Sequence, residues 1–340
     1  MKGEKYVIRL KMSKEGEAKV VDLIRGEVSF QNSLQDDFII LKSDGFPTYH
    51  LASVVDDNAM RISHVIRGEE WLSSLPKHLQ LYTYFGWPIP AFAHLPLLLN
   101  PDKSKLSKRQ GDVAVADYEA KGYLPEALLN FVAFLGWNPG TDKELYSLSE
   151  LISDFSLERV STSGAVFNLE KLNWYNREYI KKLSNTELVQ RSLPWLANID
   201  SVAEYSGLEM EKVIELERER VTTLSELPEA LRFVFEIDDY EGDVLIWRKG
   251  TREEVQKILP ELKIFFDTIR LEDWNRSTLE TKAGEWIAAH GYSVGSVLWP
   301  LRVALSGQRN SPGPYEIAAV LGKEISLRRV EAAISKLAEV

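Results

Sequence analysis

One stretch decides the fold of this chain: Leu97-Leu98-Leu99-Asn100-Pro101-Asp102-Lys103-Ser104-Lys105-Leu106-Ser107-Lys108-Arg109. Its apolar start predicts a buried strand. The Asn-Pro-Asp that follows predicts a turn, because proline cannot donate to a strand ladder. Beyond the turn, Lys105 and Lys108 lie on either side of Ser107. Ligands of open α/β sheets bind at the carboxyl edge of the strands, so this loop would carry its cations to such a site.

The composition places the chain in a broad class. Its 340 residues are enough for two or more domains, and 44% hydrophobic with 27% charged residues is typical of a soluble globular protein. No apolar run approaches the ~20 residues of a membrane span, and the start has no signal-peptide pattern, so we expect no membrane partner and a cytoplasmic location. The absence of cysteine excludes disulfides and thiolate metal sites.

The net charge of −10 disfavours long-range attraction to nucleic acid. Phosphate contacts need only a local basic stripe, however, so the charge does not exclude a nucleic-acid partner. Binding by such an acidic protein is expected to be modest and sensitive to salt.

The first third of the chain predicts an α/β core. Strands are expected at residues 6–10, 19–24, 25–30, 38–41, 61–66 and 91–99. The last of these would feed the lysine loop. Helices are expected after Thr48, and between Ser74 and Gly86, where Pro76 lies in the first turn. Strand, helix and strand with short connections are typical of a parallel sheet.

From Gly111 onward the sequence predicts helices. Residues 125–135 carry an apolar stripe that ends at Gly136. The pattern Ser/Thr-x-x-Glu, typical of a capping box at a helix start, then recurs. The matches are Ser147/Glu150, Ser184/Glu187, Ser206/Glu209, Thr223/Glu226, Thr251/Glu254 and Ser277/Glu280. This recurrence favours an all-α C-terminal half.

Several blocks resemble one known family. Lys105-Leu106-Ser107-Lys108-Arg109 resembles the Lys-Met-Ser-Lys-Ser signature of class I aminoacyl-tRNA synthetases, in the form that glutamyl enzymes favour. Other blocks are similar, in order and spacing, to those of glutamyl-tRNA synthetases: residues 44–52, 55–57, 64–71, 122–130, 166–174 and 299–307. The resemblance covers essentially the whole chain.

The resemblance implies an α/β fold, with a partial Rossmann-type catalytic half that carries the KLSKR loop. A β-rich remnant would precede this half, and an all-α C-terminal anticodon-binding region would follow it. The expected domains are residues 1–36, a remnant of the insertion that binds the tRNA acceptor end; residues 37–112, the second half of the catalytic domain; residues 113–183, a helical stem-contact domain; and residues 184–340, the anticodon-binding region.

The family's other signature, His-Ile-Gly-His, has no counterpart in this sequence. It belongs to the first nucleotide-binding half, which we expect to precede Met1. The sequence leaves open whether Met1 is a natural start, a split gene or a truncation. We therefore expect this chain to bind tRNA(Glu) but to be inactive alone, with a separate N-terminal half polypeptide as a further partner.

The resemblance implies that Lys105 and Lys108 are catalytic. Activation joins an amino-acid carboxylate to the α-phosphate of ATP, and fixed cations stabilise the charge that develops in the transition state. By the same resemblance Leu106, Ser107, Glu70, Trp71 and Leu98 contact ATP. Magnesium would arrive with ATP, and no protein zinc site is expected.

For glutamate, the resemblance implies Tyr49, Ser53 and Arg67. Arg67 lies at the carboxyl end of a predicted strand, where its guanidinium could pair with a carboxylate. From spacing alone, an ion pair of Arg67 with Glu69 or Glu70 is an equally good interpretation. Some family members carry asparagine where this chain has Ser53, so the role of that serine stays open.

Two other functions remain open at this point. One is a non-catalytic tRNA-binding module derived from a glutamyl-tRNA synthetase. The other is a tRNA-independent paralogue that glutamylates a modified nucleoside; such proteins resemble the catalytic domain without the helical region that is present here.

Overall fold

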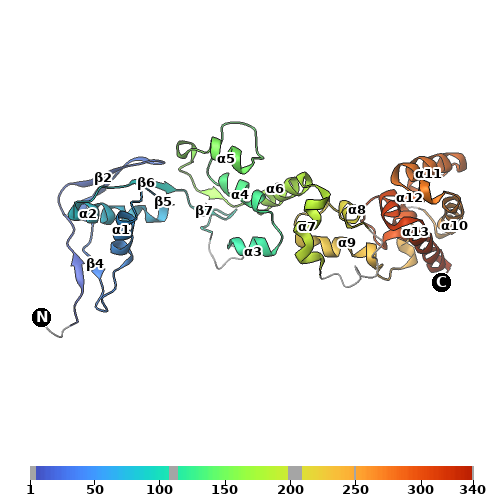
Figure 1. The fold of residues 1–340 in the computed structure, drawn as a ribbon, viewed down its shortest axis with the longest axis horizontal. Helices are drawn as coiled ribbons and strands as arrows, with labels where there is room; N and C mark the ends of the chain where they lie inside the picture. Colours follow the sequence, from blue (N-terminus) through green and yellow to red (C-terminus); the bar gives the residue numbers. More distant parts are fainter. Residues whose placement is uncertain (1–4, 107–113, 198–208, 249, 339–340) are drawn as a thin grey trace. The chain divides into compact units, whose positions relative to one another are not determined.

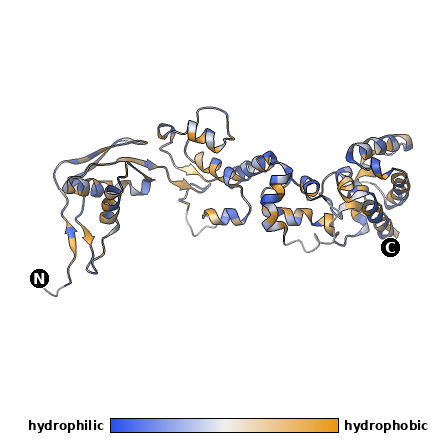
Figure 2. Cartoon of the chain, viewed as in Figure 1, coloured by the Kyte–Doolittle hydropathy of each residue, from blue (hydrophilic) through white to orange (hydrophobic). Residues whose placement is uncertain are grey.

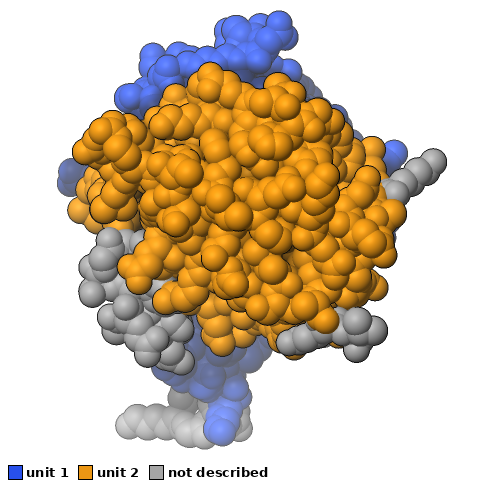
Figure 3. All heavy atoms as spheres, turned by 90° about the vertical axis from the view of Figure 1, so that its right-hand side faces the viewer, with its two compact units in different colours: residues 1–113, 126–175 blue, residues 114–125, 176–340 orange. Residues whose placement is uncertain are grey.

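The computed structural model describes residues 5–106, 114–197, 209–248 and 250–338. The chain forms two compact units, coloured separately in Figure 3. The first unit comprises residues 1–113 and 126–175, and the second comprises residues 114–125 and 176–340.

The first unit is built around a four-stranded sheet with the order β3-β2-β6-β5. Its strands are β2 (Glu17–Asp22), β3 (Gly26–Gln31), β5 (His64–Gly68) and β6 (Ala91–Leu95). β5 and β6 are parallel, and β2 and β3 form an antiparallel hairpin. The hairpin joins the sheet where Asp22 pairs with Phe92 in parallel register.

Two helices accompany the sheet (Figure 1): α1 (Tyr49–Ala59) and α2 (Leu75–Phe85). A 3-10 helix, η2 (Glu69–Ser74), leads from β5 into α2, and α2 ends at Gly86 in the left-handed conformation. The predicted strand–helix–strand unit is therefore confirmed. Its core contains Val54, Leu75, Leu79, Leu81, Tyr82 and Phe92. A separate antiparallel pair joins β1 (Ile8–Leu10) to β4 (Phe38–Leu41).

The prediction of one buried strand over residues 91–99 is wrong. β6 ends at Leu95, and β7 (Leu98–Leu99) pairs in parallel with β8 (Ala165–Val166) in a different sheet. Pro96 separates the two strands, and a proline cannot supply the amide that continued pairing requires. Leu98 is 38% exposed, so the apolar run is not buried as a strand of the main sheet.

After β7 the chain makes a tight hairpin. The amide of Leu106 donates to the carbonyl of Leu98 at 2.9 Å, and the amide of Asn100 donates to the carbonyl of Ser104 at 2.8 Å. Lys103 has a φ of 67°, in the left-handed region that non-glycine residues rarely adopt. The predicted turn is present, and it folds Lys105 back beside Leu99.

The rest of the first unit is mainly helical. It contains α4 (Pro125–Ala133), α5 (Leu148–Asp154), η3 (Leu157–Arg159) and the start of α6 (Leu169–Lys182). A second core is formed by Trp137, Tyr146, Leu151 and Val160. Leu95 and Ile24 pack against this core, so it is continuous with the sheet.

Within its described residues the second unit is entirely helical. Its elements are α3 (Val115–Ala120), the end of α6, α7 (Asn185–Leu196), α8 (Met210–Glu215), η5 (Leu224–Glu226), α9 (Leu227–Phe235), η6 (Gly242–Leu245), α10 (Arg252–Asp267), η7 (Leu271–Asp273), α11 (Arg276–His290), α12 (Val294–Ser306) and α13 (Pro314–Ala338). Figure 2 shows apolar and polar residues on the same helices, as expected for helices packed on one side. None of the helices described is long and apolar enough to cross a membrane.

The predicted capping boxes have mixed outcomes. Those at Ser147, Ser184 and Thr251 are present with both reciprocal hydrogen bonds. The one at Ser277 is wrong, because α11 begins at Arg276, so that Ser277 lies inside the helix and Asn275 is its cap. Thr223 precedes a 3-10 helix and makes no side-chain cap bond. Ser206 lies outside the described residues.

Candidate active site

Arg67 is the centre of the candidate site in the first unit. It lies near the end of β5, opposite His94 in the neighbouring strand β6. Its Nε donates to His94 Nε2 at 3.1 Å, and its Nη1 donates to His78 Nδ1 at 3.2 Å. Its Nη2 is buried and has no hydrogen-bond partner. A buried donor without a partner is costly, and an acceptor atom on a bound ligand would remove that cost.

Two aromatic rings lie beside this guanidinium. The rings of Tyr49, on α1, and Trp71, in η2, are 4.6 Å apart between centroids. The Arg67 Cζ lies 5.9 Å from the centroid of the Trp71 ring. The structure therefore brings Tyr49, Trp71 and Arg67 together from three different elements. Ser53 lies one turn along α1 from Tyr49, and its buried Oγ also has no partner.

Burial dominates the electrostatics of the site. It lowers the pKa of Arg67, although Tyr49 and Asp57 oppose that shift. Burial, followed by the charge of Arg67, lowers the pKa of His78 to about 3, so this imidazole is neutral at physiological pH. Burial raises the pKa of Asp57, against the effect of Arg67. Arg67 is thus a half-buried cation whose hydrogen-bond acceptors are uncharged rings.

The alternative interpretation, an ion pair of Arg67 with Glu69 or Glu70, is wrong. Glu69 pairs with Arg25 and also accepts from the amide of Leu97 at 3.1 Å. Glu70 pairs with Lys105 at 3.6 Å. Both neighbouring carboxylates therefore have other cations, and neither satisfies Arg67.

Only some of the residues expected to contact ATP lie in the part of the chain that the structure describes. The Lys105–Glu70 ion pair brings the hairpin after β7 to the start of η2, next to Trp71. The carbonyl of Leu98 is occupied by the amide of Leu106. Ser107 and Lys108 lie outside the described residues.

Sequence reasoning missed the residues that support Arg67. His94 Nδ1 lies 2.6 Å from Asp22 Oδ2, and both side chains are fully buried. His78 Nε2 lies 2.9 Å from His50 Nδ1. One signal was available: His94 interrupts the otherwise apolar strand Ala91–Leu95, and a buried histidine needs polar partners.

The second unit has a basic cluster of its own. Arg302, on α12, lies over the Trp299 ring with its Cζ 4.7 Å from the centroid, and its buried Nε has no partner. Burial and the charge of Arg220 both lower the pKa of Arg302, and Arg220 itself pairs with Glu217 at 2.9 Å. This cluster is a second place where an anion would be stabilised.

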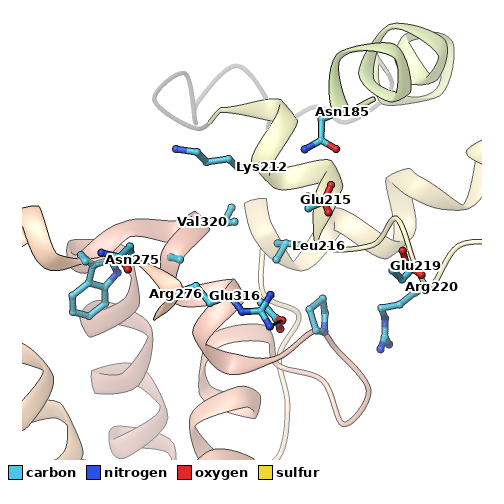
Figure 4. A pocket seen from close by; sticks show the side chains of 13 residues that line it. Asn185, Lys212, Glu215, Leu216, Glu219, Arg220, Asn275, Arg276, Glu316 and Val320 are labelled. Carbon is cyan, nitrogen blue, oxygen red and sulfur yellow. Dashed lines mark ion pairs between the residues drawn. The ribbon is translucent and has the colours of Figure 1, made fainter. Parts of the chain in front are cut away.

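Arg220 also lines a cavity of about 560 Å³ (Figure 4). Lys212 and Asn275 lie on the same cavity, and Arg276 pairs there with Glu316 at 2.8 Å. The cavity is of mixed charge, so it does not by itself define a ligand. Among the described residues, no group of three or more His, Asp or Glu is placed to hold a metal ion.

Two family profiles match the chain. Residues 1–174 match the catalytic domain of class I tRNA synthetases for E and Q, and residues 187–334 match an anticodon binding domain. The fold and the site therefore define a class I aminoacyl-tRNA synthetase with a helical anticodon-binding domain.

Individual relatives narrow this class. A glutamate–tRNA ligase of Chloroherpeton thalassium is 46% identical over 98% of this chain and 68% of its own length. One from Dehalococcoides mccartyi is 45% identical over 99% of this chain and 70% of its own length. The crystal structure of a glutamate tRNA ligase from Elizabethkingia meningosepticum, in complex with its amino acid, is 34% identical with a TM-score of 0.85, and the match covers 98% of this chain and 69% of that one. The chain belongs to the glutamate–tRNA ligase family.

Proposed function

We propose that the first unit binds glutamate and ATP for the activation step of a glutamate–tRNA ligase. The observation that carries this proposal is the buried, unpartnered Nη2 of Arg67 beside Tyr49 and Trp71. A carboxylate of glutamate would accept from Nη2 and supply the negative charge that the site lacks. The orphaned Oγ of Ser53 would be a further contact.

In this proposal the loop that carries Lys105 and Lys108 binds the phosphates of ATP. A carboxylate oxygen of glutamate attacks the α-phosphorus of ATP, and the bond to the pyrophosphate oxygen breaks. Lys105 and Lys108 would stabilise the charge on the phosphates, and Mg²⁺ would come with ATP as part of the substrate. The ion pair of Lys105 with Glu70 supports a position next to the expected nucleotide contacts, with Glu70 released when phosphates arrive.

The glutamate site can be tested through binding. Replacing Arg67 by Ala should weaken glutamate binding by about 2–5 kcal/mol, because it leaves a carboxylate unpaired in a desolvated pocket. ATP affinity should change little. Isothermal calorimetry with each ligand, on the chain completed by the separate N-terminal half, measures both affinities. Arg9→Ala, which removes an exposed guanidinium of the same unit, is the matched control. Equal losses in the two variants would return Arg67 to a structural role.

The lysines can be tested through the rate of adenylate formation. With the separate N-terminal half polypeptide supplied, Lys108→Ala should slow it by about 10²–10³, with a smaller change in ATP affinity, because a preorganised charge acts mainly in the transition state. Lys103→Gly removes a charge from the same hairpin and preserves its left-handed backbone, so it is the control. A Lys108→Ala rate within threefold of wild type would exclude this role.

We also propose that the second unit binds tRNA(Glu), with Arg302 and Arg220 as phosphate or base contacts. The buried Nε of Arg302, which has no partner, supports this. Because tRNA binding by the second unit does not require catalysis by the first, a non-catalytic tRNA-binding module is a second candidate function. A chain that binds tRNA but shows no glutamate binding by calorimetry would favour that module over the ligase.

A separate polypeptide with the first nucleotide-binding half remains a prediction. Its structural support is β5, an edge strand of the main sheet with an exposed Ile66. Exposed apolar edge strands readily pair with another chain. Pyrophosphate exchange with tRNA present should be at background for this chain alone and rise when that polypeptide is added. Full exchange by this chain alone would refute the need for it.

A further inference from the structure

We propose that Asp22 and His94 are positioning residues that lock one imidazole tautomer and thereby present the free Nη2 of Arg67 to the substrate carboxylate. The proposal deepens the proposed glutamate site and rests on Arg67 being its carboxylate partner. Neither residue would touch glutamate. They would act through Arg67.

Asp22 is rigidly held as a hydrogen-bond acceptor. Its Oδ1 accepts from the amides of Ile24 and Arg25, both at 3.0 Å, and from the amide of His94 at 3.3 Å. Burial opposes ionisation, but these bonds and the one from His94 keep the pKa of Asp22 below its ordinary value. Its Oδ2 is therefore a charged acceptor facing His94 Nδ1 at 2.6 Å.

The partners on either side then determine the tautomer of His94. A guanidinium nitrogen can only donate, so His94 Nε2 must present a lone pair to Arg67 Nε at 3.1 Å. The single proton of the neutral ring must then be on Nδ1, where Asp22 accepts it. Charge and geometry agree on the Nδ1–H form.

The other side of Arg67 is held in the same way. Nη1 donates to His78 Nδ1 at 3.2 Å, so His78 carries its proton on Nε2 and donates to His50 Nδ1 at 2.9 Å. Burial lowers the pKa of both His78 and His50, which keeps these acceptors neutral. Two imidazoles thus fix two guanidinium nitrogens, and Nη2 is left without a partner.

Replacing Asp22 by Asn should reverse the tautomer of His94, although the two side chains have almost the same shape. The Asn Oδ1 would keep the three amide bonds, and its NH₂ group would then face His94 Nδ1. Two donors cannot share a hydrogen bond, so the ring proton would move to Nε2 and oppose the Arg67 Nε–H. An amide in place of a carboxylate behind a catalytic histidine is known to impose the wrong tautomer in this manner.

The first measurement is ¹⁵N NMR of the histidine rings in the full chain. In the wild type, His94 should show a protonated Nδ1 and an unprotonated Nε2, and Asp22→Asn should exchange the two. Asp37→Asn is the control, because the Asp37 carboxylate accepts from the backbone amide of Met12 at 2.8 Å and not from an imidazole. A protonated Nε2 on His94 in the wild type would overturn the proposal.

The second measurement is glutamate affinity by calorimetry. Asp22→Asn should weaken it about 10–100-fold, the usual effect of losing a partner behind a ligand-binding group. ATP affinity should stay within threefold, and Asp37→Asn should change neither. Equal losses of glutamate affinity in both variants would mean a structural role and would overturn the proposal.

A second variant covers the case in which Asp22→Asn does not fold. His94→Gln keeps an acceptor for Arg67 on an amide that can rotate, so it should bind glutamate better than His94→Leu, which offers no acceptor. In the Gln background, Asp22→Asn should cost nothing further, because no tautomer remains to be locked. Equal affinities for the Gln and Leu variants would refute the proposal. If the wild type shows the expected tautomer and binds no glutamate, the proposed glutamate site fails while the tautomer lock stands.

Discussion

Arg67 is a cation supported by acceptors that carry no charge. Partial burial removes some of its hydration and lowers its pKa, while the imidazoles of His94 and His78 replace hydrogen bonds without replacing the lost electrostatic energy. A carboxylate at Nη2 would recover part of that energy in surroundings where Coulomb interactions are strong. The site therefore favours an acidic ligand over a neutral one of the same size.

His78 predicts how the first unit responds to acid. Its pKa is 6.5 when unfolded and about 3 when folded, chiefly because burial disfavours the charged ring, and secondarily because Arg67, Lys77 and the neighbouring histidines do. Between these values the unfolded chain binds a proton that the folded chain does not, so acid favours unfolding. The free energy of unfolding should fall by about 1.4 kcal/mol per pH unit from this group as pH drops below 6.5.

The measurement is amide hydrogen exchange in α2 between pH 7 and about 4.5. His78→Gln removes the titrating group and should flatten the loss of protection. His64→Gln, at an exposed histidine, is the control and should leave the wild-type slope unchanged. Parallel slopes for the wild type and His78→Gln would contradict the prediction.

At the level of residues, the sequence predicts the site only in part. Tyr49, Trp71 and Arg67 were found because they lie in recognisable blocks, and the structure brings them together. Asp22 was missed because it is 72 residues from His94, and no spacing rule links a strand-end aspartate to a histidine that far away. Polar partners in a core depend on strand register, which the sequence alone does not fix.

Helix starts give a prediction at the level of elements. Asn275 caps α11, and its side chain accepts from the amide of Thr278 at 3.0 Å, whereas the pattern-matched Ser277 lies inside the helix. Asn275→Ala should therefore cost about 1 kcal/mol of unfolding free energy, and Ser277→Ala should cost less than about 0.5 kcal/mol. Chemical denaturation of both variants measures this. A larger loss for Ser277→Ala would place the helix start where the sequence pattern put it.

Elements were predicted best where the signal is local. The apolar periodicity and the cap residues predicted the helices α2, α5, α7 and α10, including the residue at which each begins. The strand over residues 91–99 failed because its apolar pattern continues through Pro96, although the hydrogen bonding changes partner there from β5 to β8. An apolar pattern in the sequence indicates that a segment tends to be buried. Which sheet that segment joins depends on partner strands that are distant in the chain.

For the whole molecule, the charge of −10 requires that tRNA binding depend on a few local cations. Affinity should fall steeply as salt rises, and Arg302→Gln should reduce the slope of log affinity against log salt by about 1. Gel-shift or fluorescence titration at several salt concentrations measures this slope. Arg270→Ala removes an exposed arginine already paired with Glu272 and Asp273, and is the control. An unchanged slope for Arg302→Gln would show that Arg302 does not contact tRNA phosphates.

The junction of the hairpin with the sheet at Asp22 also has a consequence for biosynthesis. A ribosome completes β2 and β3 well before it reaches His94, which is 72 residues after Asp22. At about 5–20 residues per second, this delay is about 4–14 s. During that time the β2 edge that will meet β6 is open, and the support for Arg67 does not yet exist. Nascent chains halted before residue 90 should therefore be the form most exposed to strand-mediated aggregation and most dependent on chaperones.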